Sequence, residues 1–289
     1  MEMMNKWIKE LRITHYLKNC LIFLPAFFGG TITSGSMWKN LLVGFMAYSL
    51  GASAVYLMND IKDVEKDRMH PKKCTRPIAA GEISIKAAVT AAVGLLALCG
   101  LVLGFFAEQS VKMAAFAVFG VYLADNILYS VLGLKKVPLL DVALLVLGFY
   151  LRVLMGSVLT GIEISAWLYL VVISGAFYLA FGKRRNELKV VGNDGRDVLA
   201  GYTEHFLDKA MYTCMTMAII FFALWCIQLG EGQKYLMLVP VLMLICFKYS
   251  MDVEQDDSDG DPMNVILHDW VLIGLGMLFV IMMFVLLYV

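Results

Sequence analysis

The stretch "NDIKDVEKDRMHPKKCTRP", residues 59–77, directly follows an apolar run that reaches back to Leu41. It holds ten charged residues between Asp60 and Arg76. At roughly 2.5–3.5 kcal/mol for each charge near the centre of a bilayer, its burial in lipid would cost on the order of 25–35 kcal/mol. The apolar run is therefore suited to cross a membrane, whereas residues 59–77 must lie in water at its surface or in a polar cavity.

The composition of the whole chain also indicates a membrane protein. Of the 289 residues, 60% are hydrophobic, whereas soluble domains have about 45–50%. Lys plus Arg and Asp plus Glu both number 24, so the charge gives no reason to expect nucleic acid as a partner. The six cysteines form no CxxC pair and mostly lie in apolar runs, which favours small packing residues over disulfides or metal ligands.

Apolar runs of about 17–25 residues, long enough to cross a bilayer as helices, recur along the chain. We expect an all-α polytopic membrane protein with nine transmembrane helices. The expected spans are residues 18–33, 38–58, 86–107, 112–131, 138–159, 164–182, 209–229, 234–251 and 269–289. The first of them is interrupted by Lys18, Asn19 and Pro25.

The distribution of Lys and Arg predicts the orientation. One set of alternate connections holds nearly all of them, and the other holds only Lys39, Lys112 and Lys234. The positive-inside rule then places the N-terminus in the cytoplasm and the C-terminus outside a cell membrane. Polar chemistry falls on cytoplasmic loops near residues 59–85, 131–138, 183–208 and 252–268. A one-sided charged face favours an enzyme over a transporter, in which polar groups more often lie near the membrane midplane.

The acids of the opening stretch have a helical spacing. Asn59, Asp63 and Asp67 stand at i, i+4 and i+8, with Asp60 beside them, so a continuing helix would place the three on one face. Stacked like charges repel each other, and a divalent cation such as Mg²⁺, which takes carboxylate and phosphate oxygens, would turn that repulsion into binding. The alternative is a solvated helix extension whose acids pair with the neighbouring bases Lys62, Lys66 and Arg68.

Bases and prolines follow the acids. Pro71 and Pro77 end any helix and fix an extended turn. Arg76 is a forked donor and Lys72 a point charge, and both would suit a phosphate whose other oxygens contact the metal. The alternative is a basic patch that contacts anionic lipid headgroups.

Polar groups also occur inside the expected spans: Asp125, Asn126 and Tyr129 in the fourth, Asp141 and Arg152 in the fifth. They are functional candidates because their exposure to lipid is expensive. The alternative is a structural Asp–Arg or Asp–amide pair buried between helices. Asp141 and Arg152, about 16 Å apart along one helix, cannot pair with each other. The acidic run at residues 252–262 lacks the spacing of an EF-hand and is interpreted as a solvated loop.

The segment "NDIKDVEKDRMHPKKCTRPIAAGEIS" resembles the first aspartate-rich motif of the UbiA superfamily of intramembrane prenyltransferases. Its HPxKxxRPIAAG continuation is similar to the branch formed by the decaprenyl-phosphate phosphoribosyltransferases. Four further segments resemble pieces of the same branch: "LRITHYLKN", with Tyr16 where Trp is usual, "NILYSVLGLKKVPLLDV", "GFYLRVLMG" and "FGKRRNEL".

The resemblance implies that residues 1–289 form a single nine-helix domain with a central cavity and an active site at its cytoplasmic mouth. The branch uses Mg²⁺ to transfer phosphoribose from phosphoribosyl diphosphate to a polyprenyl phosphate, releasing diphosphate. By position, Asn59, Asp60, Asp63 and Asp67 would hold metal and diphosphate, and the three aspartates are the candidate catalytic residues. The expected substrate contacts are Lys18, Asn59, Lys72, Arg76, Asn126, Tyr129, Lys135, Arg152, Lys183, Arg184, Arg185 and Glu187.

The chain departs from the aromatic prenyltransferases after the sixth expected span. Those enzymes usually carry a second motif, D-x-x-x-D, where this chain has Lys183, Arg184 and Arg185, with Asp194 and Asp197 only later. Three adjacent bases suit an anionic lipid head better than a second metal, which favours a phosphate acceptor over an aromatic one. The alternative is a positive-inside topology anchor.

Two rival functions remain. One is an aromatic prenyltransferase with a polyprenyl diphosphate donor. The other is a lipid carrier or transporter, which predicts no product and no requirement for Asp60 or Asp63. The sequence leaves open the lipid length, a homo-oligomeric state, and a second metal at Glu187 and Asp194.

Overall fold

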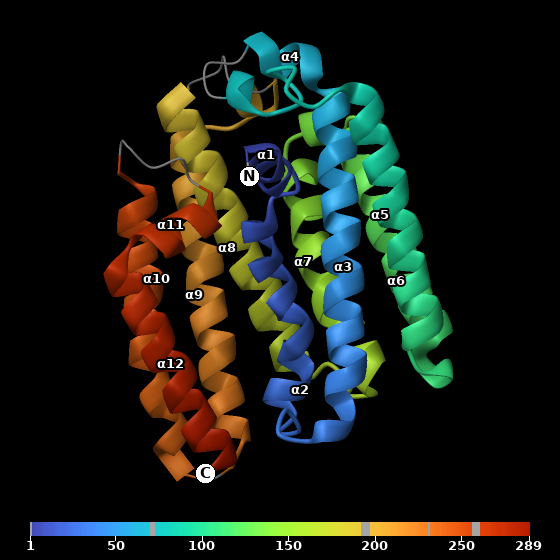
Figure 1. The fold of residues 1–289 in the computed structure, drawn as a ribbon. Helices are drawn as coiled ribbons and strands as arrows, with labels where there is room; N and C mark the ends of the chain where they lie inside the picture. The colour runs from blue at the N-terminus through green and yellow to red at the C-terminus, as the bar shows by residue number, and fades with distance from the viewer. Residues whose placement is uncertain (1, 70–72, 192–196, 231, 256–260) are drawn as a thin grey trace. The chain divides into compact units, whose positions relative to one another are not determined.

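A computed structural model describes residues 2–69, 73–191, 197–230, 232–255 and 261–289 (Figure 1). Its described residues form helices and loops and no strand, which confirms the all-α fold. Eight of the described helices are long and apolar enough to cross a membrane. They are α3 (Gly35–Lys62), α5 (Ile85–Phe106), α6 (Gln109–Asn126), α7 (Leu140–Thr160), α8 (Ala166–Val191), α9 (Glu204–Gln228), α10 (Leu238–Val253) and α12 (Trp270–Tyr288). Two are extended, α6 by η3 (Ile127–Val131) and α10 by η7 (Gly232–Met237).

The first expected span, residues 18–33, is not among the eight. After α1 (Glu2–Glu10), the chain forms a 3₁₀-helix, η1 (Ile13–Phe23), and then a short helix, α2 (Leu24–Phe28). With rises of about 2.0 and 1.5 Å per residue, the two together are about 30 Å long, close to the thickness of a hydrocarbon core. Figure 1 shows them running beside α3. The count of nine spans is not confirmed and stays a prediction.

The chain divides into two compact units. Unit 1 consists of Met1–Ser130 and Leu151–Glu163, and unit 2 of Val131–Tyr150 and Ile164–Val289. The division falls inside α7, whose first half belongs to unit 2 and whose second half belongs to unit 1. That residues 1–289 form one domain stays a prediction.

In unit 1, helices approach each other closely at glycines. A Cβ atom added to Gly44 of α3 would lie 2.1 Å from Cδ1 of Leu159 in α7. One added to Gly156 of α7 would lie 1.9 Å from the carbonyl oxygen of Ile22 in η1. Such contacts are typical of membrane helices, where packing takes over from the hydrophobic effect as the driving force. They fix α3, α7 and η1 around the polar residues described below.

In unit 2, α8 and α9 pack against each other, and α10 packs against α12. Their buried side chains include Tyr178, Leu207 and Met211. The Tyr178 hydroxyl donates to the Cys246 carbonyl of α10 over 2.6 Å, so its polar atom is satisfied in the apolar core. The short helix α11 (Pro262–His268) leads into α12.

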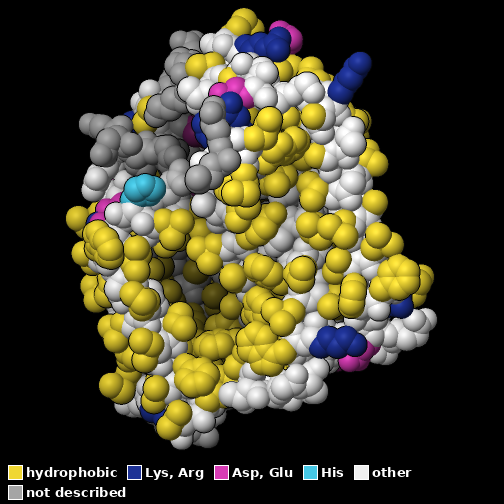
Figure 2. All heavy atoms as spheres, viewed as in Figure 1, with side chains coloured by type: hydrophobic (Ala, Val, Ile, Leu, Met, Phe, Trp, Pro, Cys, Tyr) yellow, Lys and Arg dark blue, Asp and Glu magenta, His cyan; other side chains and the backbone are white. Residues whose placement is uncertain are grey.

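Apolar side chains cover the flanks of the helices on the face shown in Figure 2, and charged side chains gather near helix ends. Phe105, Met113 and Trp270 are each more than three-quarters exposed. Such exposure suits lipid, which is as apolar as these side chains. The surface therefore supports a multi-pass membrane protein.

Candidate functional site

The acid motif lies where α3 ends. Because α3 stops at Lys62 and α4 (Val64–Met69) follows Asp63, the acids do not stand on one unbroken helix, which was the condition for the shared face. The helical relation survives in part: the Asp63 amide donates to the Asn59 carbonyl over 2.9 Å, and the Asp67 amide to the Asp63 carbonyl over 2.8 Å. The candidate ligands therefore stay close together across the break.

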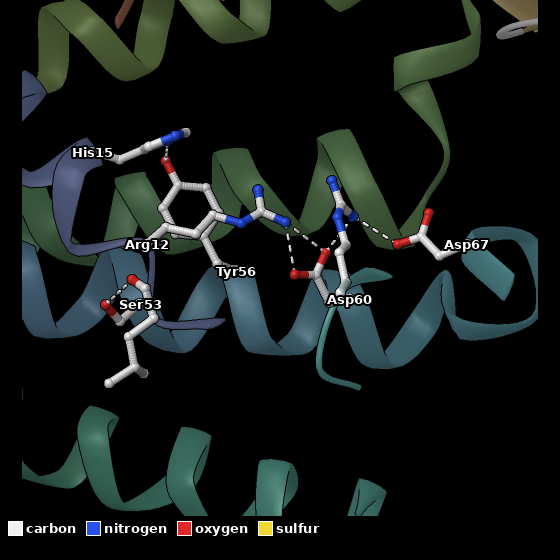
Figure 3. A network of polar contacts seen from close by, with 8 residues as sticks. Arg12, His15, Ser53, Tyr56, Asp60 and Asp67 are labelled. Atoms are coloured by element: carbon white, nitrogen blue, oxygen red, sulfur yellow. Dashed lines mark hydrogen bonds and ion pairs between the residues drawn. The ribbon is translucent and has the colours of Figure 1, made fainter. Parts of the chain in front are cut away.

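Two arginines bind the two buried aspartates of this motif (Figure 3). Asp60 and Asp67 are each 4% exposed. Nη2 of Arg12 contacts the two carboxylate oxygens of Asp60 at 2.7 and 2.6 Å. Nη1 of Arg76 donates to Asp60 over 2.7 Å and to Asp67 over 2.6 Å. The four side chains form a cluster of two carboxylates and two guanidinium groups, which we call the acid–arginine cluster.

The backbone at Arg12 takes an unusual conformation where its side chain reaches Asp60. Arg12 joins α1 to η1 with φ 52° and ψ 50°, a left-handed conformation that costs a non-glycine residue roughly 1–2 kcal/mol. The Leu11 carbonyl accepts a hydrogen bond from the Ser53 hydroxyl over 2.8 Å. The Arg12 guanidinium lies 4.7 Å from the Tyr56 ring centroid (Figure 3). A strained backbone of this kind persists only where the surrounding structure holds it, and such residues cluster at functional sites.

Helix α1 docks on the same end of unit 1. Trp7 and Leu11 pack against a buried apolar cluster that includes Leu57, Val64 and Ile78. The Lys9 ammonium also donates to the Thr75 carbonyl over 3.0 Å. The N-terminal segment is therefore part of the site, although the sequence alone indicated no site role for Glu10 or Arg12.

Glu10, like Arg12, is a site residue that could not be recognised from the sequence. It is 2% exposed, and its carboxyl group lies beside the Asp60 carboxylate and the Ile78 backbone. Burial, followed by the negative charge of Asp60, raises the pKa of Glu10 to about 7. Its only sequence signal is an acid on an amphipathic segment that also holds Glu2, and such acids are more often solvated.

The basic turn supplies Arg76 to the cluster. After the short 3₁₀-helix η2 (Lys73–Thr75), the Ile78 side chain is buried and Gly81 takes a φ of 77° that favours glycine. The Arg68 guanidinium donates to the Ala79 carbonyl over 3.3 Å and holds the turn near α4. Lys72, the other predicted phosphate contact, lies outside the described residues.

The donor chemistry of the acid motif fits Mg²⁺. Among the described residues, no group of three or more His, Cys, Asp or Glu side chains forms a ready metal cage. Mg²⁺ usually takes only one or two carboxylates and completes its shell with substrate phosphates and water. Asp60 and Asp67, with Asn59 and Asp63 half-buried beside them, would hold such an ion once the arginines release the carboxylates.

A second polar group lies in the middle of unit 1. The buried Arg152 donates from Nε to the Asn19 side-chain oxygen over 2.8 Å and contacts the Tyr122 hydroxyl at 3.4 Å. The Asn19 amide in turn donates to Ser49 over 3.0 Å. Asp125 is also buried, and its Oδ1 has no partner among the described residues. Arg152 therefore joins η1, α6 and α7 in an Arg–amide network, and its role toward substrate stays a prediction.

Four other predicted substrate contacts lie in η1, at the end of α6, in η3 and in η4. The Asn126 side chain donates to the Tyr122 carbonyl of its own helix over 2.8 Å. Tyr129 lies in η3, and Tyr129 and Lys18 are both half-buried. Lys135 lies in η4 (Leu134–Lys136) of unit 2 and is also half-buried. Their contacts with substrate stay predictions.

The bases of "KRR" are all paired within unit 2. The Lys183 ammonium contacts Asp261 at 2.7 Å, and Nε of Arg185 contacts Asp208 at 3.0 Å. The Arg184 guanidinium, 1% exposed, donates to Asp141 over 2.6 Å. It also donates to Glu187 over 2.7 Å.

Asp141 is the centre of this second network. It is fully buried and also accepts a 2.6 Å hydrogen bond from the Tyr202 hydroxyl, which itself accepts one from the Leu139 amide over 2.7 Å. The structure thus shows the buried Asp–Arg pair that the sequence left open as the alternative for Asp141, with Arg184 as the partner. Binding of a lipid head by Arg184 or Glu187 stays a prediction.

The acidic run at residues 252–262 is partly structural. Residues 256–260 and Asp194 lie outside the described residues. Asp252 pairs with Lys248, and Asp261 both pairs with Lys183 and accepts from the Met263 amide at the start of α11. The interpretation as a solvated loop is therefore wrong at these two acids: Asp252 lies in α10 and pairs within that helix, whereas Asp261 pairs with Lys183 of α8, which is distant in sequence.

Comparison with known proteins gives a family and curated relatives. The model of the UbiA prenyltransferase family matches residues 22–265. A decaprenyl-phosphate phosphoribosyltransferase of Corynebacterium glutamicum is 35% identical over 288 residues, covering 96% of this chain and 85% of the relative. One of Mycolicibacterium smegmatis is 30% identical over 286 residues, covering 92% and 87%.

Solved structures show the same fold. A UbiA homologue from Archaeoglobus fulgidus bound to GPP and Mg²⁺ matches with a TM-score of 0.72 at 18% identity. The match covers 98% of this chain and 99% of the homologue.

Proposed function

The chain belongs to the UbiA prenyltransferase family, and from this premise we propose that it transfers 5-phosphoribose from phosphoribosyl diphosphate to a polyprenyl phosphate of the decaprenyl type. It is a multi-pass membrane transferase. The choice of sugar donor and lipid acceptor is supported by the names of relatives that match nearly the whole chain. The observation that carries the proposal is the acid–arginine cluster, because it holds both donors for a metal and donors for a diphosphate.

The charges of the cluster explain how it would accept a metal-bound diphosphate. Asp60 and Asp67 balance Arg12 and Arg76 in the ligand-free arrangement. When the donor arrives, the two carboxylates would hold Mg²⁺, and the released guanidinium groups would bind diphosphate oxygens as forked donors. Each charged group would exchange one partner for another, so no buried charge would be left unpaired. An unpaired buried charge would be strongly unfavourable.

The reaction is a substitution at the anomeric carbon of ribose. The bond from this carbon to diphosphate breaks and its electron pair leaves with the diphosphate, while an oxygen of the lipid phosphate forms the new bond. Mg²⁺, when bound, supplies charge neutralisation for the leaving group. The lipid phosphate is already an anion, so the protein needs no strong general base. The side chains instead orient two anions that repel each other in solution.

We further propose that the acid motif faces the cytoplasm. The distribution of Lys and Arg supports this orientation, with the N-terminus inside and the C-terminus outside. A soluble donor such as phosphoribosyl diphosphate would then reach the acid–arginine cluster without crossing the membrane.

A donor exchange tests the proposed function. Purified protein in detergent receives Mg²⁺ and polyprenyl phosphate with labelled phosphoribosyl diphosphate, or labelled polyprenyl diphosphate with a mixture of aromatic acceptors. Label that enters a lipid only in the first reaction, and is lost with EDTA, supports the proposal. Product only in the second would make the protein an aromatic prenyltransferase. No product in either reaction would favour a carrier. Asp60→Asn serves as the inactive control for both reactions.

A further inference from the structure

The span that carries Asp125 and Tyr129 ends in a π-helical turn, η3. Turns of this kind are rare, usually single, and frequent at functional sites. The last carbonyl groups of a helix have no partner within it. Ser130 is only 2% exposed, so its carbonyl cannot rely on solvent and requires a donor from elsewhere in the protein.

That donor is Lys62. Its ammonium lies 2.5 Å from the Ser130 carbonyl oxygen, although the two residues are 68 positions apart. Lys62 is the last residue of α3, and a cation at the C-terminus of a second helix is favoured both by the free carbonyl and by the helix dipole. One ammonium group thus ties the end of α3 to the end of α6 and η3.

The residues next to this contact are candidate site residues. Lys62 directly precedes Asp63, and Ser130 directly follows Tyr129. We propose that Lys62 is a positioning residue, which sets the spacing between the acid motif and the Tyr129 turn through its hydrogen bond to the Ser130 carbonyl. The inference rests on the proposed function, because that function gives Asp63 and Tyr129 their roles.

Two other roles of Lys62 make different predictions. A direct contact with a substrate phosphate would act mainly on the KM of that substrate. A purely structural cap would act on stability and leave the turnover of folded enzyme unchanged. A positioning role acts on kcat, because the reacting groups are misplaced after the substrate has bound.

The experiment compares Lys62→Met, which removes the donor, with Lys62→Arg, which keeps a charged donor. Lys66→Met is the matched control, since Lys66 is an exposed lysine one helical turn further on, in α4. For each variant, kcat and both KM values are measured, together with hydrogen–deuterium exchange of the amides in residues 127–136. Lys62→Gln, a shorter neutral donor, replaces Lys62→Met if the latter does not fold.

In Lys62→Met, kcat should fall about ten- to a hundredfold with little change in either KM. The amides of residues 127–136 should exchange faster than in the wild type. Lys62→Arg should restore most of the kcat, and Lys66→Met should match the wild type in every measurement.

A raised KM for phosphoribosyl diphosphate with unchanged kcat and exchange would overturn the proposal in favour of a phosphate contact. Faster exchange with wild-type kcat would overturn it in favour of a cap. If the wild type makes no phosphoribosyl lipid, the proposed function fails, and the exchange data still decide whether Lys62 holds η3.

Discussion

Replacement of Arg184 by Met tests whether this base stabilises unit 2 or binds the lipid head. The pair that it forms with Asp141 is almost completely buried, at 1% and 0% exposure. In the variant, Asp141 keeps the Tyr202 hydroxyl but loses its counter-charge. Removal of one partner from a buried pair costs about 3–5 kcal/mol. At about 2–4 °C per kcal/mol, the expected loss in Tm is roughly 6–20 °C.

The assay is thermal unfolding of purified protein in detergent, with the KM for polyprenyl phosphate measured below the transition. Arg185→Met is the matched control: Arg185 is adjacent, but its partner Asp208 is 36% exposed. Pairs near solvent contribute about 0–1 kcal/mol, so this variant should melt close to the wild type.

A second variant isolates the buried charge. Arg184→Met combined with Asp141→Asn should lose less stability than Arg184→Met alone, because the asparagine still accepts from Tyr202 without leaving a charge unpaired. The reasoning is refuted if Arg184→Met melts like the wild type and its KM for the lipid phosphate rises. That result would make Arg184 a lipid-binding residue.

Three further predictions concern the acid–arginine cluster and its neighbours. Asp63→Asn should fold with a wild-type Tm and lose at least about 10²-fold in kcat, since a candidate metal ligand is neutralised; near wild-type turnover would remove the metal-site argument. Arg12→Lys keeps the charge but loses the planar guanidinium, whose Nη2 contacts both oxygens of Asp60 and whose carbon lies over the Tyr56 ring, so the KM for the donor should rise; Tyr56→Phe, which keeps the ring, serves as control. Glu10→Gln should change the pH dependence of stability in EDTA. Because the pKa of Glu10 rises from 4.5 unfolded to about 7 folded, the wild type loses stability as pH increases between these values. The glutamine variant should therefore gain up to about 3 kcal/mol at pH 8 and nothing at pH 4; equal gains at both pH values would contradict a buried titrating carboxyl.

The recurring apolar runs predicted most of the fold, because length and apolar content alone decide whether a helix can cross a membrane. They failed to settle residues 18–33, where Lys18, Asn19 and Pro25 break the run and the structure forms η1 and α2. A 3₁₀-helix has the same composition as an α-helix but a longer rise, so hydropathy does not distinguish the two.

The acids and Arg76 could be predicted because they are near each other in sequence and have a spacing with a physical meaning. Arg12 and Glu10 could not, because they reach Asp60 from about 50 residues away, through a left-handed turn that no sequence pattern announces. The partner of Asp141 could not be predicted for the same reason: Arg184 lies 43 residues further on, in another helix. In each case the residue type was informative and the pairing was tertiary.

The division of α7 between the two units has a consequence for biosynthesis. The Asn19 side-chain oxygen is bonded by Arg152, which is made 133 residues later. At about 5–20 residues per second, the ribosome would need roughly 7–27 s to produce that partner. During this interval η1 holds a polar group whose final donor does not yet exist, so unit 1 completes its interior only when the second half of α7 has entered the membrane. A chain truncated before Leu151 would lack that donor permanently, and expression of the first 130 residues alone would yield an unfinished unit rather than a smaller protein.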